Sequence, residues 1–116
     1  MSKFNEVFER CTKQIQESTD SWNTELLEAI AKGLGPSIYK QDAILVSTGS
    51  KDEVDRIRTN FITKKFGIEG KRADDAIEYA TNKIGSSNKN KLRPVFYYFI
   101  VESLGQESHY VSKKVA

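Results

Sequence analysis

The sequence predicts an all-α fold: a compact single-domain bundle of about five helices, with a short extra helix or turn near residues 38–47. Apolar residues recur at spacings of three and four in most segments, as expected for helices with one buried face. Glycines and prolines stand at the ends of these segments, where helices commonly stop. A chain of 116 residues can form one domain with its own core. We expect a helical domain at residues 1–105 and a tail at 106–116.

Two helices are predicted in the first third of the chain. The first covers residues 2–18, where one apolar stripe recurs at helical spacing: Phe4, Val7, Phe8, Cys11 and Ile15. The second begins near Asn23, and Gly33, Gly35 and Pro36 end it. Pro36 has no amide hydrogen for a further helical bond, so a turn is expected at residues 35–37.

Residues 38–48 allow two interpretations. Asp42 could cap a short helix that runs through Val46. Alternatively, residues 44–48 could form an extended strand. We favour the short helix.

The best delimited helix is predicted to run from Ser50 to Gly67. Ser50 and Glu53 have the spacing of a capping box, in which each side chain binds a free backbone amide at the helix start. Gly67 suits the left-handed conformation that ends many helices. A further helix is predicted at residues 72–84, with Gly85 as its stop.

The apolar run at residues 95–101 consists of residues that favour strands. A strand here would need residues 44–48 as its partner, and a lone two-stranded ribbon is marginal in water. A helix from about Leu92 to Leu104 places Pro94 in its first turn and Gly105 at its C-terminal cap. We therefore predict a helix and keep the strand pairing as the alternative.

Three sequence strings carry a resemblance to a known family. LGPSIY at 34–39, NFITKKFGI at 60–68 and SNKNKLRPVFYYFIV at 87–101 together resemble the bacterial domain of unknown function family 2853, over roughly residues 30–104. The resemblance implies a small all-helical domain and brings no known activity, cofactor or catalytic residue. Pro94 departs from the family pattern, where a helix-favouring residue such as alanine is expected.

The side chains predict no catalytic, metal or cofactor site. His109 is the single histidine, which disfavours a histidine metal pair or a Ser-His-Asp triad. Cys11 lies on the apolar stripe and should act as a small hydrophobe. Acidic residues gather at the start of the helix at 72–84, where the helix dipole favours them, with a bound cation as the weaker alternative: Asp74, Asp75 and Glu78. We expect a protein that is not an enzyme.

Composition predicts a soluble cytoplasmic protein with no membrane partner. Hydrophobic residues make up 38% and charged residues 29% of the chain. The longest apolar run is far shorter than the roughly 20 residues that span a bilayer. The first ten residues mix acids with apolar side chains, unlike a secretory signal. A single cysteine suits a reducing compartment.

Residues 56–93 form a locally basic part of the chain, with ten cations and four acids. Such a run is typical of a solvated surface, and it can also mark an anionic partner. Lys89, Lys91 and Arg93 are expected in a solvated polar turn, and Tyr97 either stacks on a ligand or lines the core boundary. The candidate contacts for an anion or partner are Lys64, Lys65, Arg72, Lys89, Lys91, Arg93 and Tyr97.

Two functional hypotheses follow from these observations. The favoured one is a non-enzymatic module that binds a protein partner or itself. The alternative is a binder of nucleic acid or a small anionic nucleotide through residues 56–72 and 89–93. The position of these cations on the folded surface should discriminate between them.

Overall fold

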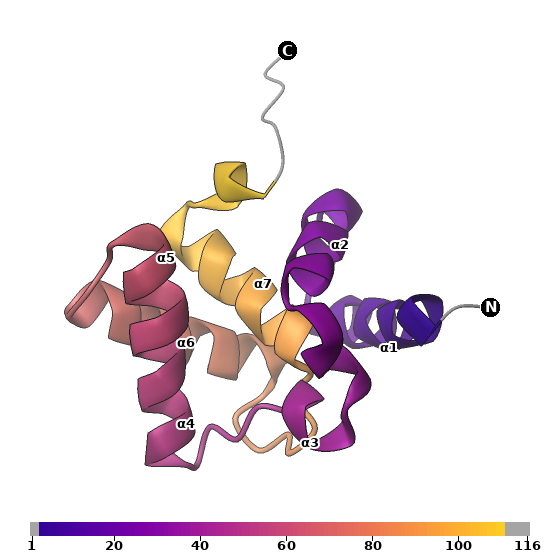
Figure 1. Ribbon diagram of the computed structural model, residues 1–116, viewed down its shortest axis with the longest axis horizontal. Helices are drawn as coiled ribbons and strands as arrows, with labels where there is room; N and C mark the ends of the chain where they lie inside the picture. Colours follow the sequence, from indigo (N-terminus) through magenta and orange to yellow (C-terminus); the bar gives the residue numbers. More distant parts are fainter. Residues whose placement is uncertain (1–2, 111–116) are drawn as a thin grey trace.

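The computed structural model describes residues 3–110, apart from the side chains of residues 37, 41 and 42, as a bundle of helices around one buried helix (Figure 1). Its α-helices are α1 (Lys3–Ser18), α2 (Thr24–Gly33), α3 (Gln41–Ile44), α4 (Lys51–Arg56), α5 (Lys64–Phe66), α6 (Lys71–Ile84) and α7 (Arg93–Leu104). Short 3-10 helices form at η1 (Gly35–Tyr39) and η3 (Glu107–His109), and η2 (Ile57–Thr63) is π-helical. Because η2 joins α4 to α5 in one continuous run, the bundle has five main helices and the short α3. The predicted all-α class is confirmed.

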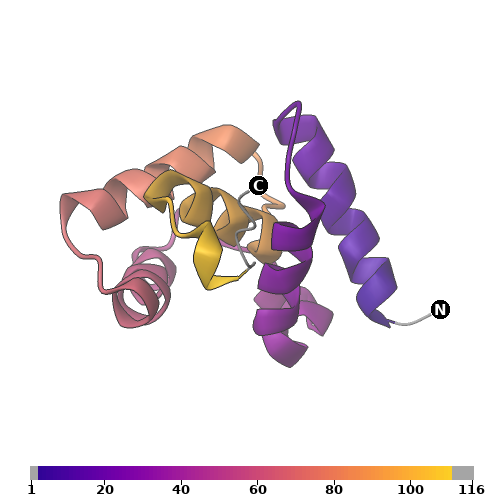
Figure 2. The ribbon, with the colours of Figure 1, turned by 90° about the horizontal axis from the view of Figure 1, so that it is seen from above.

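Helix α7 is the centre of the core. Residues 94–101 are all buried, and α6, α2, α1 and α3 pack around them. Figures 1 and 2 show α7 running between the α1–α2 pair and the α4–α6 side of the molecule. A helix covered on every side carries apolar residues on every face, so its sequence lacks the usual amphipathic stripe. Pro94 lies in the first turn and Gly105 takes a left-handed φ of 68°, which confirms both predicted ends.

Tyr98 connects this core helix to the start of α2. Its hydroxyl accepts a hydrogen bond from the backbone N–H of Asn23 at 2.8 Å. The Asn23 side chain in turn accepts from the N–H of Leu26 at 3.2 Å, as an N-terminal cap does. The predicted start of the second helix is confirmed, and the buried phenol has the polar partner that it requires.

The segment after η1 combines the two predicted alternatives. Residues 41–44 form the short helix α3, and Leu45 then makes a single antiparallel bridge with Leu92. The predicted cap was wrong, because Lys40 occupies the N-cap position and Asp42 lies inside the helix. The partner of Leu45 is thus Leu92, the residue before α7, and not the run at 95–101, because that run is helical.

The run from Ser50 to Gly67 differs from the prediction in two details. The Ser50 hydroxyl accepts from the Glu53 N–H at 3.3 Å, but the Glu53 carboxylate binds Arg93 instead of returning to Ser50. Only half of the predicted capping box therefore forms. The middle of the run is π-helical rather than a regular α-helix. Gly67 ends the run with a φ of 70°, as predicted.

Arg93 connects three segments at the start of α7. Its Nε donates to the Ala43 carbonyl at 2.6 Å, and one terminal nitrogen donates to the Leu45 carbonyl at 3.3 Å and to Glu53 at 2.6 Å. The other terminal nitrogen donates to the Tyr97 hydroxyl at 3.1 Å. We call this set of contacts the Arg93 clamp. The side chains of Arg93 and Glu53 are only 14% and 16% exposed, so the expectation of a solvated Arg93 was wrong.

Cys11 lies fully buried on the inner face of α1. Burial raises the pKa of its thiol to about 12, because the thiolate would lose its hydration. The side chain therefore acts as the small hydrophobe that the sequence predicts.

The two ends of the chain are described only in part. Residue 2, the predicted start of the first helix, lies outside the described residues, as does the predicted tail after Tyr110. Within the first part of that tail, η3 places the ring of His109 edge-on to Phe66 at 4.7 Å. Tyr110 packs against the core.

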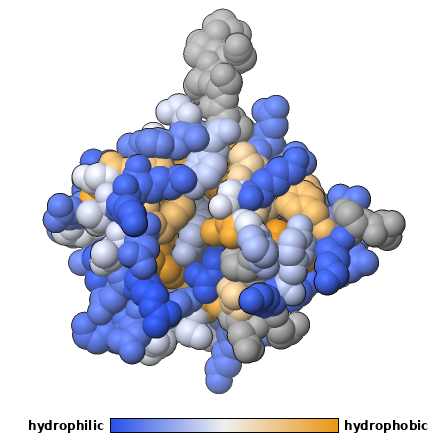
Figure 3. Space-filling view, viewed as in Figure 1, coloured by the Kyte–Doolittle hydropathy of each residue, from blue (hydrophilic) through white to orange (hydrophobic). Residues whose placement is uncertain are grey.

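Within residues 3–110, no helix is long and apolar enough to cross a membrane. Figure 3 shows hydrophilic side chains around the margin of one face of the molecule, with apolar surface between them in the middle.

We predict that Phe99→Ala lowers the free energy of unfolding by about 3–5 kcal/mol, because Phe99 is fully buried at the centre of α7. Urea denaturation followed by circular dichroism measures the change. The exposed Lys89 is the control, and Lys89→Ala should stay within about 0.5 kcal/mol of the wild type. Equal small effects would show that α7 is peripheral.

We predict that Arg93→Met costs about 3 kcal/mol of stability, because it leaves the half-buried Glu53 carboxylate and two backbone carbonyls without their donor. Adding Glu53→Gln should recover part of this loss, since the stranded charge is then gone. Thermal unfolding of both single variants and the double variant gives the coupling free energy between Arg93 and Glu53. Strictly additive effects would contradict the clamp.

Candidate binding groove

A groove with a volume of about 1070 Å³ lies between the α4–η2 run and α6. Ser50, Val54 and Arg58 line one wall, because residues four apart share one face of a helix. Residues of α6 line the other wall: Asp74, Ile77, Glu78, Thr81 and Asn82. The loops at 46–50 and 86–91 complete the lining. The groove is therefore built from four segments that are distant in sequence.

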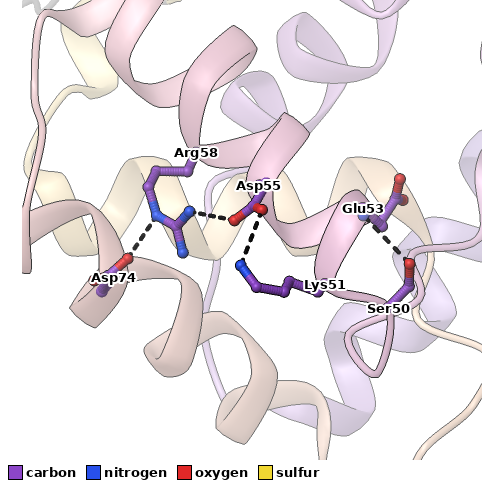
Figure 4. Close-up of polar contacts among 6 residues, drawn as sticks. All are labelled: Ser50, Lys51, Glu53, Asp55, Arg58 and Asp74. Atoms are coloured by element: carbon purple, nitrogen blue, oxygen red, sulfur yellow. Dashed lines mark hydrogen bonds and ion pairs between the residues drawn. The ribbon is translucent and has the colours of Figure 1, made fainter.

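An ion-pair network, drawn in Figure 4, joins the two walls of the groove through Arg58 and Asp74 at the start of α6, which we call the closed end. Arg58 donates to Asp74 on α6 at 2.6 Å and to Asp55 on α4 at 2.6 Å. Lys51 lies 3.4 Å from Asp55. The hydrogen bond from Arg58 lowers the pKa of Asp55, because it favours the ionised carboxylate. Arg58 thus holds the start of α6 against the α4–η2 run and sets the width of the groove here.

The lining combines apolar and uncharged polar side chains. Val46, Val54 and Ile77 are its apolar members. The polar members are mostly hydroxyls and amides. Several make no side-chain hydrogen bond with another residue in the described range 3–110: Ser47, Thr48, Asn82, Ser86 and Ser87. Such groups can bind the amides and carbonyls of a ligand.

The opposite end of the groove holds two lysines, Lys89 and Lys91. Lys91 is only 2% exposed, and its ammonium donates to the backbone carbonyls of Ser86 and Asn88. Burial lowers the pKa of this ammonium. Neither lysine forms an ion pair with a carboxylate of the described part of the chain. We call this region the lysine end.

Gln14 of α1 binds the chain just after the loop at 86–91 and fixes the loop to α1. Its amide nitrogen donates to the Asn90 carbonyl at 2.8 Å, and its amide oxygen accepts from the Leu92 N–H at 2.9 Å. The Val46 N–H also donates to the Lys91 carbonyl at 2.9 Å. Both loops of the groove are therefore tied to the body of the fold.

The structure separates the seven residues that the sequence suggests as contacts. Lys64 and Lys65 stand at the end of the α4–α5 run, with Lys65 over the ring of Tyr110. Arg72 lies in the first turn of α6 and donates to the Leu104 carbonyl at 3.4 Å. Lys89 follows the other end of this 14-residue helix, about 20 Å away along its axis. These cations do not form one continuous surface.

The remaining three candidates are buried or occupied. Lys91 is buried, which corrects the expectation of a solvated side chain. Arg93 belongs to the Arg93 clamp. Tyr97 is 7% exposed and stacks on Phe61 with ring centroids 4.0 Å apart, so it lines the core rather than presenting an open platform.

The acidic cluster on α6 is mostly paired. Asp74 binds Arg58, and Asp75 binds Lys71 at 3.2 Å. Among the side chains that the structure describes, no three of the types His, Cys, Asp or Glu are grouped so that they could hold a metal ion.

Sequence reasoning missed the groove as a unit. Its hydroxyls and amides lie mainly in two polar turns, at 47–50 and 86–90, each of which reads as an ordinary loop. The sequence does contain a signal for the groove, namely two turns of similar polar composition. It does not show that the turns lie close together, because their proximity depends on the bridge between Leu45 and Leu92.

Comparison with known proteins identifies the family. A search of curated proteins found no match. The family model described as "Protein of unknown function (DUF2853)" matches residues 10–108, which includes the three strings that carry the resemblance and extends well before them. The chain therefore belongs to the DUF2853 family of proteins of unknown function.

Proposed function

We propose that this domain is a non-catalytic, cytoplasmic protein-interaction module, and that the groove between the α4–η2 run and α6 binds a segment of its partner. The observation that carries the proposal is the lining of the groove, which combines apolar side chains with several hydroxyls and one amide that make no side-chain hydrogen bond to the described part of the chain. Apolar lining favours binding through the surface that it removes from water. The polar side chains supply hydrogen bonds to a peptide backbone.

The fixed loops support binding without a large entropic cost. Gln14 and the Val46–Lys91 hydrogen bond tie the two loops to the bundle, and Arg58 ties the two walls together. A surface that is already ordered before binding loses less conformational freedom when a partner arrives. The volume, about 1070 Å³, leaves room for a short peptide segment.

Self-association is the second form of the same proposal. Tyr39 is 42% exposed and borders a smaller hollow of about 470 Å³ whose lining includes Phe4, Pro36 and Ile38. Aromatic side chains at a surface are enriched where proteins meet. Sedimentation of the purified protein across concentrations distinguishes a self-associating module from one that binds another protein.

The alternative function, binding of nucleic acid or a small anionic nucleotide, is supported by the lysine end alone. Lys89 is exposed and unpaired within the described residues, and Lys91 carries a second charge beneath it. Most nucleic-acid binders neutralise several phosphates along one surface. The separation of Lys64 and Arg72 from Lys89 therefore ranks this function second.

We predict that a photo-reactive amino acid at Asn82, an exposed position on the groove wall, crosslinks a defined protein in native lysate. The same amino acid at Glu6, exposed on α1, is the matched control and should not capture that protein. Ser87→Trp should abolish the crosslink by filling the groove. Equal capture from both positions, or capture that survives Ser87→Trp, would contradict the groove as the binding surface.

We predict that the Kd for single-stranded DNA or RNA is above about 1 μM at physiological salt, which is the range of non-specific binding. Lys64→Glu, Lys65→Glu and Lys89→Glu together reverse exposed charges and should leave the fold intact. Fluorescence anisotropy across salt concentrations measures the affinity and its salt dependence. A tighter affinity that this triple variant abolishes would favour the nucleic-acid function instead.

A further inference from the structure

We propose that the partner segment carries an acidic side chain, aspartate or glutamate, that binds at the lysine end of the groove against Lys89. This inference rests on the proposed function, and it adds the chemistry of the partner. It arises from the distribution of charge inside the groove.

Lys91 is a buried cation within the lysine end. Its ammonium is bound by two backbone carbonyls, of Ser86 and Asn88, and by no carboxylate of the described residues. A buried cation usually has a paired anion, because carbonyl dipoles replace only part of its hydration. A carboxylate arriving above the loop would supply that missing charge.

Lys89 provides the contact at the surface. It is exposed, lines the groove and has no ion-pair partner among the side chains that the structure describes, so its ammonium can reach an incoming carboxylate. The hydroxyls of Ser86 and Ser87 lie in the same loop and can donate further hydrogen bonds. A carboxylate accepts several such bonds at once.

The other charges of the groove favour this position over the closed end. Asp74 and Arg58 neutralise each other there. Glu78 lies on the α6 wall without an ion pair among the described residues, six residues before the end of the helix at Ile84. Six residues correspond to about 9 Å along the axis. An acidic side chain of the partner is therefore repelled near Glu78 and attracted by Lys89, beyond the end of α6.

An internal side chain fits better than a chain terminus. Ser86, Ser87 and Lys89 are all exposed, so the groove meets solvent at this loop. An extended segment can continue over the loop and leave its side chain against Lys89. In an extended chain successive side chains alternate in direction, so one acidic residue can point to the loop while its neighbours face the apolar lining or solvent.

The test uses a phage-displayed library of random 12-residue peptides, selected on the immobilised full chain. Selection on the wild type should enrich an aspartate or glutamate at a fixed position of the binding motif. Lys64→Glu is the matched control, because it reverses an equally exposed lysine outside the groove, and it should leave the motif unchanged. Selection on Lys89→Glu should lose the acidic residue from that position.

Synthetic peptides from the selection then measure the contact. Affinity for the wild type should fall about fivefold or more in Lys89→Glu, and neutralising the acidic peptide residue should matter much less in Lys89→Gln than in the wild type. The selection could instead yield peptides that carry no acidic residue and whose binding is abolished by Ser87→Trp. That result would overturn this inference and leave the proposed function standing. Failure to select any groove-dependent peptide would contradict both.

Discussion

The contacts of one side chain, Arg93, hold together segments that lie 40 to 50 residues apart in the sequence. The guanidinium lies at the first residue of the buried helix α7 and binds the end of α3, the bridge residue Leu45 and the carboxylate of Glu53. Arginine suits this position because its planar group donates in several fixed directions at once. Without these bonds, two carbonyls and a carboxylate would lie half-buried without partners. The position of α4, and hence of one groove wall, depends on this site.

Local rules predicted most of the helices, because their ends are set by neighbouring residues. Gly67 and Gly105 take left-handed conformations, and Asn23 caps α2, as their positions in the sequence suggest. The same rules failed where a distant residue competes for a local group. Glu53 has the spacing of a capping residue, yet the guanidinium of Arg93 is a stronger partner than a helix-start amide. The π-helical stretch also has no clear signal in apolar spacing, because seven residues are too few to distinguish its longer repeat from that of an α-helix.

The basic residues show why charge in a sequence is a poor guide to a binding surface. Lys89, Lys91 and Arg93 alternate over five positions and look equivalent in the sequence. In the fold, Lys89 is exposed, Lys91 donates to backbone carbonyls, and Arg93 lies between three segments. The chain enters α7 at this point, so successive residues face different surroundings. The groove could not be predicted for a related reason: its four segments meet only after α7 is in place.

The order of elements along the chain places the centre of the bundle last among its main helices. Helices α1 to α6 all precede α7, and α1, α2 and α6 bury their apolar faces against it. During synthesis at about 5–20 residues per second, these faces are made before the helix that covers them. The core of the bundle can therefore be completed only after α7 has been made, and the apolar faces of α1, α2 and α6 lack their cover until then.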